Sequence, residues 1–275
     1  MQNNRIARVL QAMQAQGMTQ MIVSDPQSID YLTGVYVEPF ERLFALYLRA
    51  DGRHIFFLNK LFTVPETPIE KVWFTDTDDA VGMIAARVEA GAPLGIDKTW
   101  PARFLLPLME RLPGTPCRLA SDCVDGVRAC KDAAEQELMR ENSRINDEAM
   151  RRAAAYIREG MTEREVADYL LAQYQALGCE GPSFPPIVSF GANAADPHHA
   201  PDDTCLQAGD CIVLDIGGKK DGYCSDMTRT YFCRSVSDKH AAIHDLVSRA
   251  NEAAEALIRP CVPLCEMDKA ALDLI

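Results

Sequence analysis

The feature that most constrains this chain is a strand–turn–strand pattern over residues 211–233 that carries two aspartates. The apolar run 212–214 predicts a buried strand, and Asp221-Gly222 is typical of a tight turn before a second strand. If the hairpin is centred just before Asp221, Asp215 lies directly opposite Asp226. If Asp221-Gly222 is a two-residue loop, the two acids lie diagonally. Because side chains alternate along a strand, both registers place the carboxylates on one face.

Two carboxylates on one sheet face repel each other. Directly opposed Cβ atoms lie about 5 Å apart, and two negative charges at that separation repel by roughly 3 kcal/mol at an effective dielectric constant of about 20. A protein with Asp215 and Asp226 so placed either protonates one of them or binds a cation. Hard divalent metals with oxygen ligands fit best. The alternative is that Asp215 ends its strand and Asp226 is solvated.

The glycines after Asp215 leave a second interpretation open. Residues 215–218, Asp-Ile-Gly-Gly, resemble the start of the phosphate-binding loop of sugar kinases and actin. That loop normally begins a nucleotide-binding domain, whereas only 57 of the 275 residues follow Gly218. Neither G-x-x-x-x-G-K-[ST] nor G-x-G-x-x-G occurs in the sequence. We therefore prefer the metal site.

The composition excludes several classes of protein. A formal net charge of −12 gives no positive field for a nucleic-acid backbone. The chain has no apolar run long enough for a membrane span, and Gln and Asn interrupt the apolar positions near the N-terminus, which excludes a secretory signal. We therefore expect a soluble cytoplasmic protein. The ten cysteines include no C-x-x-C pair, so we expect reduced, buried thiols rather than a zinc or redox site.

The order of expected elements indicates two domains. In the first part, strands alternate with helices, which is typical of an α/β unit; the expected helices are 4–16 and 102–111, and the expected strands are 21–23, 43–48, 54–58 and 93–97. Two long helices then begin at capping-box signals, Asp132 with Glu135 and Thr162 with Glu165, and end at Gly160 and Gly178. We place the domains at 1–128 and 129–275. Residues 265–275 look like the first turns of a helix without a stop signal, so we expect the chain to be cut there.

Four segments of the chain share their residues with one known family. They are Gly222-Tyr223-x-Ser225-Asp226-x-Thr228-Arg229-Thr230; the loop 193–198, which ends in Pro-His; Lys131 with 134–137; and Ser24-Asp25-Pro26 with 31–34. Together they resemble the pita-bread metallopeptidases, in the branch of Xaa-Pro aminopeptidases and prolidases. The resemblance implies an α/β (α+β) fold: a creatinase-like N-terminal α/β domain followed by an incomplete pita-bread catalytic domain.

The resemblance also implies roles for individual residues. Asp215 and Asp226 match the two metal-binding aspartates of the family, of which the second bridges two ions. His198 matches a histidine that contacts the substrate or the tetrahedral intermediate. His199, its neighbour, is expected to point elsewhere. Thr228 is expected to orient a metal-binding carboxylate from behind.

The family completes its metal site with one His and two Glu from a later segment. After Asp226 this chain offers only His240, His244, Glu252, Glu255 and Glu266, all in helix-like stretches, and we expect the two histidines to be solvated. A chain with this partial ligand set is expected to bind metal weakly or not at all.

The resemblance implies an activity. It predicts hydrolysis of Xaa-Pro bonds in peptides or dipeptides by a water activated between two divalent ions, which would be Mn, Co, Zn or Fe. It also implies a homodimer. Two alternatives are a non-catalytic scaffold or binding protein of the same fold and a creatinase-like amidinohydrolase, which would have no reason to keep both Asp215 and Asp226.

Overall fold

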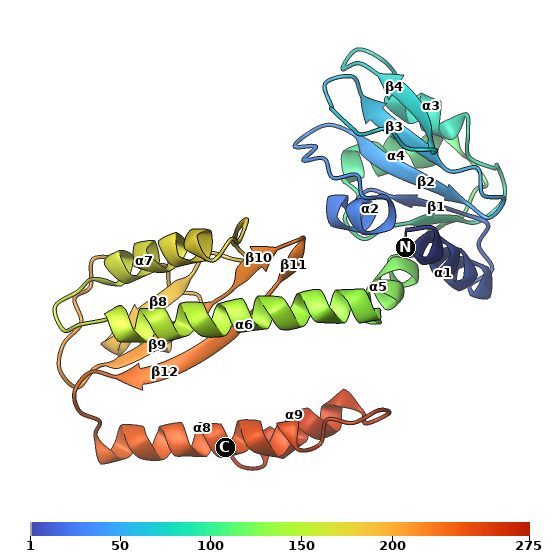
Figure 1. Ribbon diagram of the computed structural model, residues 1–275. Helices are drawn as coiled ribbons and strands as arrows, with labels where there is room; N and C mark the ends of the chain where they lie inside the picture. Colours follow the sequence, from blue (N-terminus) through green and yellow to red (C-terminus); the bar gives the residue numbers. More distant parts are fainter. Residues whose placement is uncertain (1) are drawn as a thin grey trace. The chain divides into compact units, whose positions relative to one another are not determined.

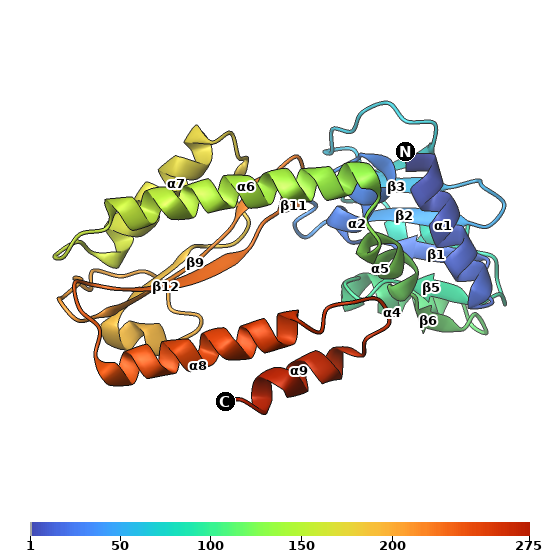
Figure 2. The same cartoon turned by 60° about the horizontal axis from the view of Figure 1, so that its bottom comes forward.

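The computed structural model describes residues 2–275, and the chain divides into two compact units, Met1–Asp132 and Ala133–Ile275. Each unit has its own strands and its own buried apolar residues (Figures 1 and 2). Among the described residues, no helix combines the length and the apolar character needed to cross a membrane.

The first unit is built on a six-stranded mixed sheet. Its strands, in the order β4-β3-β2-β1-β5-β6, are Glu70–Phe74, Ile55–Asn59, Phe44–Arg49, Gln20–Val23, Leu94–Ile96 and Cys117–Leu119. The pairs β1–β2 and β2–β3 are antiparallel, while β3–β4, β1–β5 and β5–β6 are parallel. Its helices are α1 (Gln2–Ala15), α2 (Pro26–Thr33), α3 (Ala80–Ala85), α4 (Ala102–Arg111) and α5 (Asp122–Ala129). The predicted α/β unit is confirmed.

Both faces of this sheet are buried under helices. Phe56 belongs to a core cluster with residues of α1, α2 and α5, while its neighbour Phe57 belongs to a second cluster with residues of α3 and α4. All five residues of β3 are buried for this reason. The unbroken apolar run of β3 in the sequence therefore reflects a strand that is covered on both sides.

The second unit combines long helices with two three-stranded antiparallel sheets. Its elements are α6 (Ala133–Tyr156), α7 (Glu163–Ala176), β7 (Gly181–Pro182), β8 (Ile187–Phe190), the 3₁₀ turn η1 (Gly191–Ala195), β9 (Cys211–Ile216), β10 (Gly218–Lys220), β11 (Tyr223–Cys224), β12 (Met227–Phe232), α8 (Asp238–Glu255) and α9 (Leu264–Leu272). The strand orders are β12-β9-β8 and β11-β10-β7. The α6 and α7 helices cover one face of β8 and β9 (Figure 1).

The two faces of β9 differ in burial. Ile212, Leu214 and Ile216 are buried in the cluster with α6 and α7, whereas the alternating residues, including Asp215, are half-buried. We call the second face, which carries Asp215, the aspartate face. At one end of this face a cavity of about 500 Å³ separates β9 and β12 from α8, and Ile243 and Val247 of that helix line it.

Most expected elements form, and some of their ends differ. The 102–111 helix, the β2–β3 hairpin and the capping box of Thr162 with Glu165 are confirmed. The helix expected to reach Gly160 ends at Tyr156, because Gly160 donates to the carbonyl of Leu206 instead of continuing the helix. The single strand expected over 223–233 is two strands, and α9 ends at Leu272.

The expectation of buried thiols is wrong for half of the cysteines. All ten are free, but only Cys123 and Cys233 are buried, and five are exposed: Cys130, Cys205, Cys224, Cys261 and Cys265. The exposed cysteines lie in different kinds of structure: Cys224 is in β11, Cys205 forms an isolated β-bridge with Thr162, and Cys265 is in α9. The spacing of the cysteines in the sequence did not predict their exposure.

Candidate metal centre and histidine loop

The hairpin turn fixes the register of the candidate site. Lys220 pairs with Tyr223, which leaves Asp221-Gly222 as a two-residue loop. Both loop residues have positive φ, 51° and 76°, which is the conformation of a type I′ turn and explains the Asp-Gly pair. The same register continues into β9 and β12, where Asp215 pairs with Thr228. The diagonal arrangement is therefore the correct one of the two predicted registers.

This register determines which side chains share the aspartate face. Asp226 directly precedes β12 and falls opposite Gly217, diagonally across from Asp215. By alternation, Asp215, Asp226 and Thr228 project from one face. Asp226 is exposed and Asp215 is half-buried, so both carboxylates are accessible to a ligand.

Thr228 contacts Asp215 directly. Its Oγ1 donates a hydrogen bond of 2.9 Å to Oδ1 of Asp215. This bond orients the carboxylate and uses only one of its acceptor positions, of which an ionised carboxylate has about four. The remaining oxygens of Asp215, with those of Asp226, form a hard anionic donor set that fits a divalent cation.

Glycine is required where β9 turns into β10. A Cβ on Gly217 would lie 2.1 Å from both Ser183 Oγ and the carbonyl oxygen of Ser225, and a Cβ on Gly218 would lie 2.8 Å from the ring of Tyr174. Because both glycines lack a Cβ, the backbone at these two positions can lie close to Ser183, Ser225 and Tyr174. Packing, rather than phosphate binding, accounts for the Asp-Ile-Gly-Gly sequence.

Buried polar groups of α6 and α7 bind the hairpin on the face opposite to the aspartate face. Asn146 of α6 donates through Nδ2 to the carbonyl of Ile216 at 3.1 Å, and its Oδ1 accepts from the Tyr174 hydroxyl at 2.5 Å. Burial raises the pKa of Tyr174, and the negative charges of Cys179, Asp215 and Asp226 raise it further. The residue after Asp215 is therefore anchored to the helical layer. The sequence pattern did not reveal this anchor.

His198 and His199 have opposite environments. Both lie in the loop after β8, the strand that pairs with β9, and the loop is held locally by a bond of 2.9 Å from the His198 backbone N–H to Asp196. The His198 side chain is exposed, whereas the His199 side chain is only 14% exposed and its Nε2 lies 2.6 Å from Glu163 Oε2. His199 thus points toward α7, and His198 is the histidine available to a ligand.

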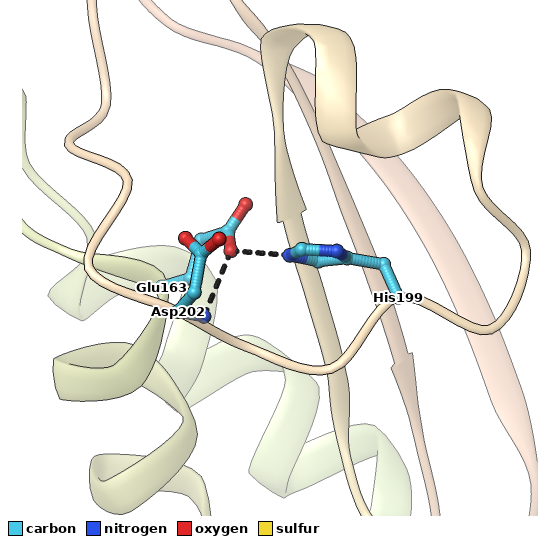
Figure 3. Close-up of side chains that lie close together, drawn as sticks. All are labelled: Glu163, His199 and Asp202. Atoms are coloured by element: carbon cyan, nitrogen blue, oxygen red, sulfur yellow. Dashed lines mark hydrogen bonds and ion pairs between the residues drawn. The ribbon is translucent and has the colours of Figure 1, made fainter.

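Glu163 of α7 forms a compact cluster with two residues of this loop, His199 and Asp202 (Figure 3). Glu163 is the first residue of α7 and is completely buried. Hydrogen bonds with Thr204 lower the pKa of Asp202. Glu163 could not be singled out from the sequence, because an acid in the first turn of a helix is also typical of a solvated residue that interacts with the helix dipole.

The other acids and histidines do not join the aspartate face. His240, His244, Glu252 and Glu255 lie on α8 and Glu266 lies on α9, and all five are exposed. His240 and His244 lie against the ring of Phe232, with centroid distances of 6.2 and 6.0 Å. Within residues 2–275, therefore, no histidine of these helices completes a ligand set with Asp215 and Asp226.

Comparisons with known proteins agree for both units. Residues 137–275 match the model of metallopeptidase family M24, and residues 5–130 match that of the creatinase/prolidase N-terminal domain. The probable dipeptidase PepE of Mycobacterium tuberculosis is 32% identical, with 98% of this chain and 74% of the relative covered.

Solved structures give the same result. The dipeptidase PepE from Mycobacterium ulcerans has a TM-score of 0.92 at 32% identity and covers 99% of this chain and 76% of its own. A prolidase from Thermococcus sibiricus has a TM-score of 0.91 at 27% identity and covers 100% of this chain and 77% of its own. The architecture of both units is thus found in experimentally determined proteins.

Proposed function

The chain belongs to metallopeptidase family M24 and carries a creatinase/prolidase N-terminal domain, and from this premise we propose that it is a metal-dependent exopeptidase that hydrolyses Xaa-Pro bonds. Similarity to a dipeptidase and a prolidase supports a short substrate, an Xaa-Pro dipeptide or a peptide with proline in second position. The fold expected from the resemblance is confirmed. We propose residues 1–128 and 129–275 as its N-terminal and catalytic domains.

The observation that carries the proposal is the hairpin with Asp215 and Asp226 on one face and Thr228 bonded to Asp215. We propose that the two carboxylates bind divalent metal ions. The family resemblance favours a site with two such ions. Such ions supply Lewis acidity and lower the pKa of a bound water to about 7. Carboxylate oxygens accept Mn²⁺, Co²⁺, Zn²⁺ and Fe²⁺ alike. Thr228 keeps the Asp215 carboxylate in one orientation, which reduces the reorganisation needed to bind the cation.

His198 is the proposed contact to the substrate. Its side chain is exposed on the loop beside the strand of Asp215, and an imidazole there can donate a hydrogen bond to the carbonyl oxygen of the scissile amide. That bond strengthens as negative charge develops on the oxygen, so its contribution appears mainly in kcat. We also propose a cytoplasmic location, which the sequence predicts, and a homodimer, which the family resemblance implies.

The test is an assay of the purified chain with added Mn²⁺ or Co²⁺. An Xaa-Pro dipeptide, a longer Xaa-Pro peptide and a matched Xaa-Ala dipeptide would be compared by release of the first residue. Because the two aspartates are only part of the family's ligand set, we expect residues 1–275 alone to bind metal weakly and to show no appreciable turnover. In a protein that carries the complete ligand set, we expect turnover of a proline substrate that is lost in Asp226→Asn, a change that keeps the size of the side chain and removes its charge. Metal content would be measured in parallel. Metal binding with the complete ligand set but without turnover of any of the three substrates would instead identify a non-catalytic member of the fold.

A further inference from the structure

Glu163 gathers an unusual number of donors for a buried carboxylate. Its side chain is fully buried, and it lies at the start of α7. Oε1 accepts from the backbone N–H of Phe190 at 2.7 Å and from Asn193 Nδ2 at 3.0 Å. Oε2 accepts from the backbone N–H of Asp202 at 3.1 Å and is bonded to His199 Nε2 at 2.6 Å. We call residues 191–202, which contain both histidines, the histidine loop. The one carboxylate of Glu163 thus connects α7 to the end of β8, to η1 at the start of this loop, and to Asp202 at its end.

The backbone reinforces the same junction. The N–H of Glu163 donates to the carbonyl of Thr204 at 3.2 Å, and the N–H of Arg164 donates to the carbonyl of Asp202 at 3.1 Å. The loop that contains His198 is therefore fastened at its two ends and, through His199, near its middle. Because His199 is drawn inward, the adjacent His198 is the residue that remains on the outside.

The cluster has the geometry of a hydrogen-bonded carboxylate rather than of a metal site. Ligand atoms at about 2.0–2.2 Å from a tetrahedral ion lie roughly 3.3 Å from one another, well beyond the 2.6 Å between His199 Nε2 and Glu163 Oε2. Two backbone N–H groups, from Phe190 and Asp202, also point at the carboxylate and would face the ion with their positive ends. A proton between Glu163 and His199 suits this arrangement better than a cation.

We propose that Glu163 and His199 are positioning residues for the reaction: the buried carboxylate holds the His199 ring inward and thereby fixes the loop so that His198 faces the substrate. This inference rests on the proposed function for the role of His198, while the loop geometry stands independently of it. Outer partners of metal ligands commonly contribute about 10- to 100-fold in metal affinity or activity, and we expect an effect of that size for the residues that hold His198.

The test compares two substitutions at one position. His199→Phe keeps a ring and removes the bond to Glu163, whereas His199→Gln keeps a donor that can reach the carboxylate. We expect His199→Phe to lower kcat by about 10- to 100-fold with little change in KM, and His199→Gln to restore most of the loss. His240→Phe, on the exposed surface of α8, is the matched control and should leave kcat unchanged.

Amide hydrogen exchange supplies a measurement that does not depend on turnover. Faster exchange at Asp202 in His199→Phe, with metal content unchanged, is the expected result. If the wild-type protein with a complete metal-ligand set turned over no substrate, the proposed function would fail, and exchange would still test the loop. Unchanged exchange in His199→Phe, or wild-type kcat in that variant of an active protein, would overturn the positioning role. Stoichiometric loss of a bound ion in His199→Phe would show that the cluster is a metal site instead.

Discussion

Two neighbouring pairs of residues, Phe56-Phe57 in β3 and Leu214-Asp215 in β9, show how differently the two sheets are used. Phe56 and Phe57 point to opposite faces of their sheet, and each is buried in an apolar cluster. Leu214 is equally buried, but Asp215 projects from a face with an accessible carboxylate. The side chains of a strand that is covered on both faces contribute to stability. A strand that is covered on one face also presents side chains that can bind a ligand on the other. Substitutions on the two sheets should therefore separate stability from activity.

The largest effect is expected for Phe57→Ala. Removing a fully buried phenylalanine leaves a cavity and should lower the free energy of unfolding of the first unit by about 3–5 kcal/mol. Denaturant unfolding measures this loss. Phe40→Ala removes the same side chain at a site that is 79% exposed and should change stability by less than about 0.5 kcal/mol. Equal losses in the two variants would mean that burial in the sheet does not determine the cost.

His198→Ala should have the next largest effect, and on activity rather than stability. In a protein with the complete metal-ligand set, we expect kcat to fall by about 10²-fold or more with metal content unchanged, because the lost group stabilises developing charge on the substrate. His244→Ala, an exposed histidine of α8, serves as the control. Stoichiometric metal loss in His198→Ala would reassign this residue as a ligand.

Thr228→Val tests the aspartate face itself with a smaller change. Valine keeps the shape of threonine and removes the hydroxyl that bonds Asp215, so metal affinity should fall by about 10-fold, as measured by titration of the metal-free protein. Thr230→Val lies two residues along the same strand, opposite Val213, and should change the affinity much less. If both variants bound metal like the wild type, the Thr228–Asp215 bond would have no part in binding.

The smallest effect concerns Tyr174 at alkaline pH. Its pKa is raised in the folded protein, so the unfolded chain loses the phenolic proton first, at about pH 10, and stability falls as the pH rises above that value. Tyr174→Phe lacks this titration. Between about pH 8 and about pH 10.5 the stability advantage of the wild type over the variant should shrink by about 1 kcal/mol or slightly less. A difference that stays constant over this range would contradict the raised pKa.

Local patterns in the sequence predicted the parts of the site that depend on local geometry. The Asp221-Gly222 pair predicts a two-residue turn with positive φ at both positions. The alternation of side chains along the strands then places Asp215 and Asp226 on one face. The capping box at Thr162 likewise needs only the four residues 162–165. Such features follow from sequence because the interacting groups are close along the chain.

The supporting groups could not be predicted, because their partners are distant in sequence. Glu163 is bonded to residues 27 to 39 positions away, and Asn146 reaches a carbonyl 70 positions away. Both Glu163 and the exposed Glu165 lie in the first turn of α7, but only Glu165 has a partner close along the chain, Thr162, and the sequence therefore revealed only Glu165. The strand β4 was missed for another reason: its burial pattern does not alternate.

The two-residue turn at Asp221-Gly222 also limits how the length of this hairpin can change. A one-residue slip of β12 against β9 would carry Asp226 to the opposite face, away from Asp215. A residue inserted within the turn can be taken up by a longer loop, which leaves the strand pairing and the faces of both aspartates as they are. Loss of one residue from a two-residue loop cannot be taken up in this way. Related or engineered sequences that keep both acids in use should therefore lengthen this turn more readily than shorten it, whereas the turn between β2 and β3, where both faces are apolar, has no carboxylate pair to keep together.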